Sequence, residues 1–208
     1  MPSAPAALRL LLVNPNSNPA VTALVAAAAQ RVLDPGTTAE AVEPGGGPLS
    51  IETLEHRRRA EPLAIDLLAR HPGYDAYAMA CFDDIALAAG RRFLGRPIVG
   101  SAEAALAIAR CHAPRVAIVT TVDSMVPGIR ALLRDMGAEG WCSVRAAGIG
   151  VADAARGGDA VEARIDAAIT LARDIDGAGA IILGSGGLAG RAAALARKHR
   201  IPVIDSIE

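Results

Sequence analysis

The chain has 208 residues, of which 52% are hydrophobic and 2% aromatic, and its formal net charge at pH 7 is -1. A chain of this length can bury one substantial core or two lobes of about 100 residues each. The basic residues are scattered, and no apolar stretch approaches the roughly 18 residues of a membrane span. The first residues also lack the basic and apolar regions of a signal peptide. We therefore expect a cytoplasmic protein with neither a nucleic-acid nor a membrane partner.

The cysteines and histidines give no sign of a disulfide framework or a metal site. Cys81, Cys111 and Cys142 stand about 30 residues apart without a C-x-x-C pair, and the histidines form no H-x-H or H-x-x-x-H pair. We therefore expect no bound metal. The three arginines at 57–59 are predicted to form a solvated helix face rather than a phosphate-binding site.

Short apolar runs alternate with longer helical patterns along the chain. The runs predict strands over 8–13, 76–80, 97–99, 116–119, 180–183 and 202–204. The helical patterns cover 21–33, 62–70, 103–110, 127–136 and 161–173. Asn18 before Pro19 is typical of an N-cap followed by proline at the first helical position. This alternation favours βαβ units and therefore an α/β fold with parallel sheets flanked by helices.

The second half of the chain repeats the pattern of the first. Aligning LRLLLVNPNS with PRVAIVTTVD, RPIVGSAE with IPVIDSIE, and AYAMACFDD with AIILGSGGL gives nearly one offset of about 105 residues. This predicts two pseudo-symmetric α/β lobes, residues 1–100 and 101–208, and places Cys81 opposite Ser185. Because ligands bind beyond the carboxyl ends of parallel strands, we expect an active site in the cleft between the lobes.

The stretch IILGSGGLAG also satisfies a dinucleotide-binding pattern. Gly184, Gly186 and Ala189 fit G-x-G-x-x-A, and Asp205 follows about 20 residues later. The first lobe has no such glycines, and too little chain follows the second set to build an adenosine-binding half. We therefore favour a small-molecule site, and keep a nucleotide-binding oxidoreductase as a third hypothesis.

Cys81 ends a predicted strand and precedes the helix-like DDIALAAGRRF. At a helix N-terminus the dipole and the free N–H groups favour the thiolate and lower its pKa. Asp83 and Asp84 would oppose that effect if they pointed inward, and one of them is expected to cap that helix. Cys111 and Cys142 have no such placement and are predicted to be structural.

The motifs LLVNPNSN, ACFDD, VGSAEAAL, VAIVTTVDSMVP and ILGSGGL, in this order, resemble the hydantoin and allantoin racemase branch of the Asp/Glu racemase superfamily. The resemblance covers nearly the whole chain. It implies a cofactor-independent enzyme of two pseudo-symmetric lobes, often a homo-oligomer, that uses one cysteine from each lobe. One thiolate removes the proton on the carbon next to a carbonyl, and the other thiol reprotonates the opposite face.

The second cysteine of the family pattern falls on Ser185. Racemisation requires two acid–base groups with pKa values near the working pH, and a serine hydroxyl is a far weaker acid than a thiol. We expect a racemase or epimerase of a hydantoin-, allantoin- or amino-acid-derived substrate, with Cys81 and Ser185 as the catalytic pair. The alternative is a single-cysteine, cofactor-free lyase like the arylmalonate decarboxylases, or an inactive ligand-binding family member.

Loop position and the resemblance suggest the substrate-binding groups. Asn14, Asn16 and Ser17 follow the first strand, and Thr120 and Thr121 follow its counterpart in the second lobe. The backbone N–H groups of Phe82 and Gly186 follow the two catalytic positions. Such donors stabilise a developing enolate oxygen.

The end of the chain differs from its repeat. DSIE stops where the equivalent GSAEAALAIAR continues as a helix. We therefore expect that a C-terminal helix is missing after residue 208, and that the apolar surface it would cover is exposed or covered by a partner.

Overall fold

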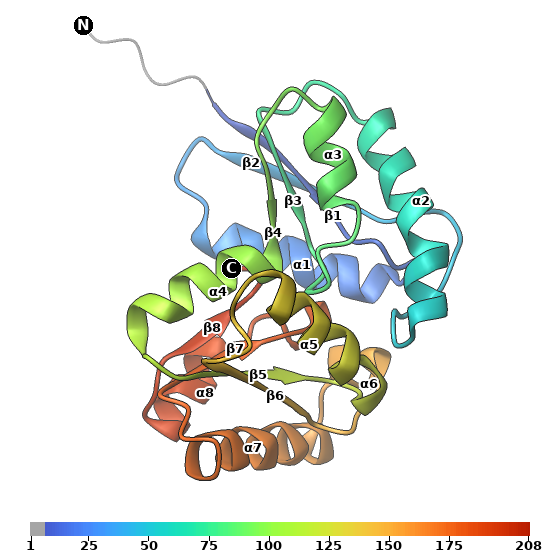
Figure 1. The fold of residues 1–208 in the computed structure, drawn as a ribbon. Coiled ribbons are helices and arrows are strands. Elements are labelled where there is room, and N and C mark those ends of the chain that lie inside the picture. Colours follow the sequence, from blue (N-terminus) through green and yellow to red (C-terminus); the bar gives the residue numbers. More distant parts are fainter. Residues whose placement is uncertain (1–6) are drawn as a thin grey trace, which may run out of the picture.

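Two four-stranded parallel sheets form the framework of residues 7–208, the part of the chain that this computed structural model describes (Figure 1). The first sheet has the order β2-β1-β3-β4 and consists of β1 (Arg9–Val13), β2 (Thr38–Val42), β3 (Ala76–Met79) and β4 (Ile98–Gly100). The second has the order β6-β5-β7-β8 and consists of β5 (Val116–Thr120), β6 (Cys142–Ala146), β7 (Ala180–Leu183) and β8 (Val203–Asp205). The equal strand orders confirm the predicted α/β fold of two similar lobes.

Helices cover both faces of each sheet. They are α1 (Pro19–Val32), α2 (Leu54–Arg70), α3 (Leu87–Phe93), α4 (Ser101–His112), α5 (Val126–Asp135), α6 (Val151–Arg156), α7 (Asp159–Asp174) and α8 (Ala192–His199), with two 3-10 turns, η1 (Asp123–Met125) and η2 (Gly186–Leu188). Helices α2 and α3 share a core with one face of the first sheet, and α1 packs on the other face. In the second lobe α4 and α5 cover one face, and α7 and α8 cover the other.

Helix α4 joins the two lobes. It follows β4 of the first sheet directly, but its buried side chains, Ala102, Ala105, Leu106 and Ala109, belong to the core of the second lobe. Figure 1 shows α1 and α4 lying between the two sheets. The β4–α4 junction is therefore the point where the chain passes from the first lobe to the second.

Strands β2 and β6, each at one edge of its sheet, were not predicted from the sequence. Their sequences, TAEAV and CSVRA, contain polar residues, and each strand is only partly buried. A partly buried strand needs no continuous apolar run, so it gives a weak signal in the sequence. The short helix α6 was also missed.

The predicted helix starts were right for α1 and wrong for α2. Asn18 accepts a hydrogen bond from the backbone N–H of Ala20, and Pro19 begins α1 as expected. Helix α2 begins at Leu54, because the Thr53 side chain accepts the N–H of His56, and Pro62 lies inside the helix. The prediction treated Pro62 as the helix start and so lost the first two turns.

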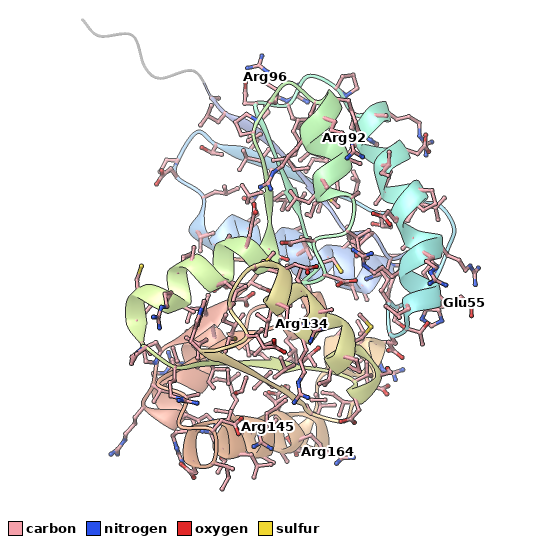
Figure 2. The ribbon with its side chains drawn as sticks, viewed as in Figure 1. Glu55, Arg92, Arg96, Arg134, Arg145 and Arg164 are labelled. Atoms are coloured by element: carbon pink, nitrogen blue, oxygen red, sulfur yellow. The ribbon has the colours of Figure 1, made fainter. Side chains whose placement is uncertain are left out.

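The surface carries scattered charge and one apolar area near the end of the chain. In Figure 2 the labelled arginines are spread over the molecule, with Arg96 at one end and Arg164 at the other. Val99 is 43% exposed and Ile108 is 52% exposed. Both border an apolar groove that also touches Ile207. Across residues 7–208, no helix is both long and apolar enough to cross a membrane.

Candidate active site

A cavity opens between the two lobes where β1, β3, β5 and β7 end. Cys81, which follows β3, and Ser185, which follows β7, both border it. Their loops also touch each other: a Cβ placed on Gly186 would lie 3.4 Å from the carbonyl oxygen of Ala80. The sequence predicted these two walls, and the fold brings them to one cavity as expected from the equivalent strand positions.

The loop of Cys81 is a strained turn and not the start of a helix. Helix α3 begins only at Leu87, and Asp84 and Ala86 have positive φ angles of 45° and 65°. Burial, and then the nearby charge of Asp83, raise the pKa of the Cys81 thiol to about 12. The backbone amide of Asp83 and the Arg57 guanidinium act in the opposite direction on that pKa. The expected lowering of the thiol pKa by a helix N-terminus was therefore wrong.

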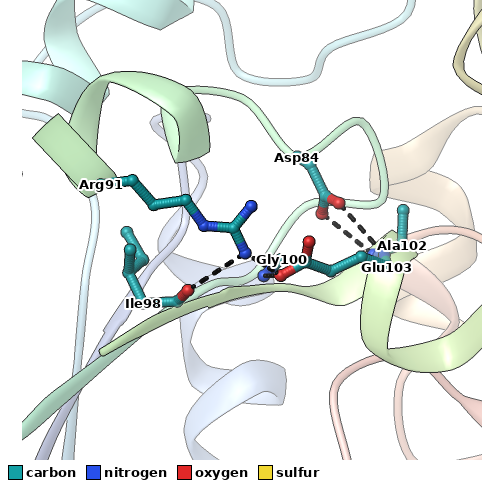
Figure 3. A network of polar contacts seen from close by, with 6 residues as sticks. All are labelled: Asp84, Arg91, Ile98, Gly100, Ala102 and Glu103. Carbon is teal, nitrogen blue, oxygen red and sulfur yellow. Dashed lines mark hydrogen bonds and ion pairs between the residues drawn. The ribbon is translucent and has the colours of Figure 1, made fainter. Parts of the chain in front are cut away.

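Asp84 caps a helix, but not the helix that follows it in sequence. Its carboxylate accepts the backbone N–H groups of Ala102 at 2.9 Å and Glu103 at 3.1 Å, at the start of α4 (Figure 3). A Cβ on Gly100 would lie 2.3 Å from the Asp84 Cγ, so only glycine fits beneath this carboxylate. Burial raises the pKa of Asp84 to about 6, and the two amides lower it. The Cys81 loop is thereby fastened to the helix that enters the second lobe.

Ser185 is held by its own loop. Its Oγ accepts the backbone N–H of Gly187 at 3.3 Å, which caps η2. The preceding Gly184 is essential to the packing, because a Cβ there would lie 2.5 Å from Ile118 Cγ2 and 3.4 Å from the Phe82 ring. Among residues 7–208, no basic side chain is hydrogen-bonded to the Ser185 hydroxyl, so no internal base activates it.

Two of the predicted binding residues support the site without bordering it. Asn14 is completely buried, and its Nδ2 donates to the Asn16 Oδ1 at 3.1 Å and to the Thr22 hydroxyl at 3.0 Å. The Ser17 hydroxyl donates to the carbonyl of Gly47 at 3.2 Å. Neither residue lines the cavity, and their polar atoms hold the loop after β1, so their contact with a substrate stays a prediction.

The other predicted residues, Asn16, Phe82, Thr120, Thr121 and Gly186, border the cavity. The Asn16 Oδ1 accepts from Asn14 and from a backbone amide, whereas its Nδ2 has no acceptor in the described part of the chain. Thr120 donates its hydroxyl to the carbonyl of Gly184 at 3.2 Å, which ties β5 to the Ser185 loop. The Thr120 hydroxyl proton is thus already used, and among the predicted binding residues that border the cavity Asn16 and Thr121 keep an unused side-chain donor.

Residues 10–208 match the family model described as Asp/Glu/hydantoin racemase. The chain belongs to this racemase family. A hydantoin racemase of Paenarthrobacter aurescens is 34% identical to it, over 97% of this chain and 87% of that protein. Racemases are isomerases, and the family places the chain in this enzyme class.

Two solved structures of allantoin racemases have closely similar folds. The enzyme from Klebsiella pneumoniae has a TM-score of 0.92 at 35% identity, over 96% of this chain and 83% of that chain. The enzyme from Pseudomonas fluorescens also has a TM-score of 0.92, at 30% identity, over 96% of this chain and 86% of that chain. The racemase fold therefore extends over nearly all of the chain.

Sequence reasoning missed one charged pair in the site of this racemase-family chain. Asp83 borders the cavity beside Cys81, and its Oδ2 accepts the Nε–H of Arg57 at 2.5 Å. Burial raises the pKa of Asp83, and Arg57 lowers it. The arginine run was predicted to be a solvated face, and no sequence pattern links position 57 on α2 with a loop 26 residues later.

A second missed residue, Glu52, connects the two lobes beside the cavity. Its Oε1 accepts the N–H of Val151 at 2.9 Å, at the start of α6. Its carbonyl accepts the Ser124 hydroxyl at 2.5 Å. The partners lie 99 and 72 residues away, so only the assembled fold reveals this contact.

Asp205, the acidic residue of the dinucleotide pattern, stabilises the fold. The Asp205 carboxylate accepts the backbone N–H groups of Gly190 at 2.6 Å and Ile207 at 3.0 Å. It fastens the loop after η2 to the end of β8. In residues 7–208, no three His, Cys, Asp or Glu side chains are grouped in a way that would hold a metal ion.

Proposed function

We propose that this chain is a cofactor-independent racemase or epimerase acting on the α-carbon of a hydantoin-, allantoin- or amino-acid-derived substrate. Cys81 is the acid–base group on one face of that carbon, and Ser185 occupies the other face. The observation that supports this most strongly is the shared cavity, which Cys81 and Ser185 border from equivalent loops of two similar lobes.

The proton balance of this reaction is simple. The Cys81 thiolate takes the proton from the α-carbon, and the electron pair of the broken C–H bond moves onto the adjacent carbonyl oxygen as an enolate. A proton returned to the same face restores the substrate, whereas one delivered to the opposite face gives its mirror image. We assign the backbone N–H groups of Phe82 and Gly186, with Asn16 and Thr121, to the carbonyl and enolate oxygens.

Ser185 makes the two faces unequal. Its hydroxyl accepts a hydrogen bond from Gly187, and no base is hydrogen-bonded to it among residues 7–208, so it is a poor proton donor and, as a neutral group, a poorer proton acceptor than a thiolate. We therefore propose that α-proton exchange at the Cys81 face is faster than inversion. Replacing Ser185 by cysteine supplies the second acid–base group.

Proton NMR in heavy water tests the proposal. Single enantiomers of 5-methylhydantoin and allantoin are incubated with the parent chain, and the loss of the α-proton and the optical rotation are followed. We expect exchange with mostly retained configuration, and Ser185→Cys should raise inversion by about 100-fold or more, the usual gain from a positioned acid–base group.

Matched variants identify the thiol that reacts. Cys81→Ala should abolish exchange, whereas Cys111→Ala should leave it unchanged, because Cys111 is exposed on α4 and lies outside the cavity. Absence of exchange and inversion in both the parent and Ser185→Cys, with both folded, would contradict the racemase proposal. Release of carbon dioxide from a small malonate would then favour the single-cysteine lyase.

We also propose that the protein is a cytoplasmic homo-oligomer. Several large apolar side chains are exposed, including Leu49 at 65% and Leu54 at 60%, on and beside the start of α2. Association of copies would cover such residues. Sedimentation velocity measures the assembly, and a monomer at micromolar concentration would contradict it.

A further inference from the structure

The cavity is asymmetric in charge. Of the residues that border it within the described part of the chain, Asp83 is the only acidic one, and no lysine, arginine or histidine lines it. The remaining lining is apolar or neutral and polar. A ligand in this cavity therefore lies beside one acidic residue and no basic one.

Arg57 compensates Asp83 from outside. Its Nε–H donates to the Asp83 Oδ2, and its Nη1 lies 4.0 Å from Glu61 on the same helix, so one guanidinium is shared by two acids. Arg57 itself does not border the cavity. The second oxygen of Asp83, Oδ1, has no hydrogen-bond donor among residues 7–208.

The position of Asp83 relative to Cys81 limits which part of a substrate it meets. Both residues lie on the loop after β3 and border the same cavity. A substrate whose α-carbon lies against the Cys81 thiol must place the groups attached to that carbon near the neighbouring wall. In a cyclic ureide, one of these groups is a ring N–H, which is a donor for a carboxylate oxygen.

We propose that Asp83 is a specificity-determining residue, which accepts a hydrogen bond from a substrate N–H and rejects substrates that carry a carboxylate beside the α-carbon. This rests on the proposed function and narrows its substrate class to uncharged cyclic ureides. A second carboxylate in this cavity would meet the charge of Asp83 without a bordering cation, which is unfavourable both as like-charge repulsion and as an unpaired desolvated charge. Free amino acids, malonates and N-carbamoyl amino acids all carry such a group.

A matched pair of ligands compares binding of the uncharged ring with binding of a carboxylate. Hydantoin and N-carbamoylglycine contain the same ureido group, but the second is the opened ring and carries a carboxylate. Calorimetric titration should give a dissociation constant for N-carbamoylglycine about 100-fold or more above that for hydantoin, because like charges cost several kcal/mol. In Asp83→Asn this ratio should narrow about tenfold or more, through weaker ring binding and stronger binding of the anion.

Arg57→Gln is the matched control. It breaks the same ion pair but keeps the Asp83 carboxylate. The ratio of the dissociation constants of N-carbamoylglycine and hydantoin should therefore stay the same or increase. Asp83→Ala provides a second variant without the carboxylate, and thermal unfolding verifies that each variant is folded. For exchange of 5-methylhydantoin, Asp83→Asn should raise KM by a larger factor than it lowers kcat, since ground-state binding is lost.

The outcomes distinguish this inference from the function it rests on. If the parent exchanges the α-proton of hydantoins and both Asp83 variants keep the parent's ratio, the specificity role is wrong and the racemase proposal stands. If Arg57→Gln narrows the ratio as much as Asp83→Asn, the effect comes from loss of the ion pair, and the role of Asp83 is again wrong. If the parent neither binds hydantoin nor exchanges its proton, the proposed function and this inference fail together.

Discussion

Replacing Asp84 by alanine measures how firmly the Cys81 loop is held by α4. The substitution removes the acceptor of two backbone N–H groups at the helix start, those of Ala102 and Glu103. Loss of an N-cap costs about 0.5–2 kcal/mol, and leaving a buried donor unsatisfied costs about 1–3 kcal/mol. Because these contributions overlap, we expect a loss of about 2–4 kcal/mol in the free energy of unfolding.

Asparagine is the matched control at this position. Asp84 has a φ of 45°, and Asn adopts this left-handed conformation more readily than other side chains while keeping an acceptor oxygen. The Asn variant should therefore stay within about 1 kcal/mol of the parent. For a chain of this size the alanine variant should melt roughly 4–16 °C lower, as measured by circular dichroism. Equal melting temperatures for the alanine and asparagine variants would refute the capping argument.

The parent and the Asp84→Asn variant together test the titration of Asp84. Burial raises its pKa in the folded protein to about 6, above the value of about 3.9 in an unfolded chain. Between about pH 4 and 6 the folded state therefore binds more protons at this site, and the free energy of unfolding falls as the pH rises. The free energy of unfolding of the parent minus that of Asp84→Asn should decline over this pH window and be constant above it. A difference that rises with pH would contradict the raised pKa of Asp84.

Three further predictions concern the contact of Glu52, the packing of Gly184 and the pKa of Cys81. Glu52→Ala removes the acceptor of the Val151 N–H and should cost about 1 kcal/mol, whereas Glu52→Gln keeps an acceptor and should cost less; equal thermal unfolding curves for the two would contradict the contact. Gly184→Ala places a Cβ 2.5 Å from the Cγ2 of Ile118 and should cost about 1–3 kcal/mol. In a double-mutant cycle this cost should be smaller in the Ile118→Ala background, which removes that methyl group. With the Cys81 pKa near about 12, α-proton exchange should rise about tenfold per pH unit between pH 7 and 10, and a plateau below pH 8 would refute the raised pKa.

The sequence alone determined six of the eight strands of the two sheets and the pairing of the two proposed catalytic positions. Strands β5 and β7 are buried along their whole length, so their apolar runs are continuous and easily recognised. Because the repeat aligns β3 with β7, the residues that follow them, Cys81 and Ser185, had to lie on equivalent loops. Local chemistry likewise determined the start of α1 at Asn18, where the cap and the helix are neighbours in sequence.

The tertiary structure alone decided which polar groups meet. Asp84 caps a helix 18 residues away, Asp83 pairs with an arginine 26 residues away, and Glu52 reaches across the lobes to a residue 99 positions later. Each single carboxylate looks the same in the sequence as any solvated one, since its partner has no fixed spacing. Helix packing and the approach of the lobes determine these distances, and with them the burial that shifts the pKa values at the site.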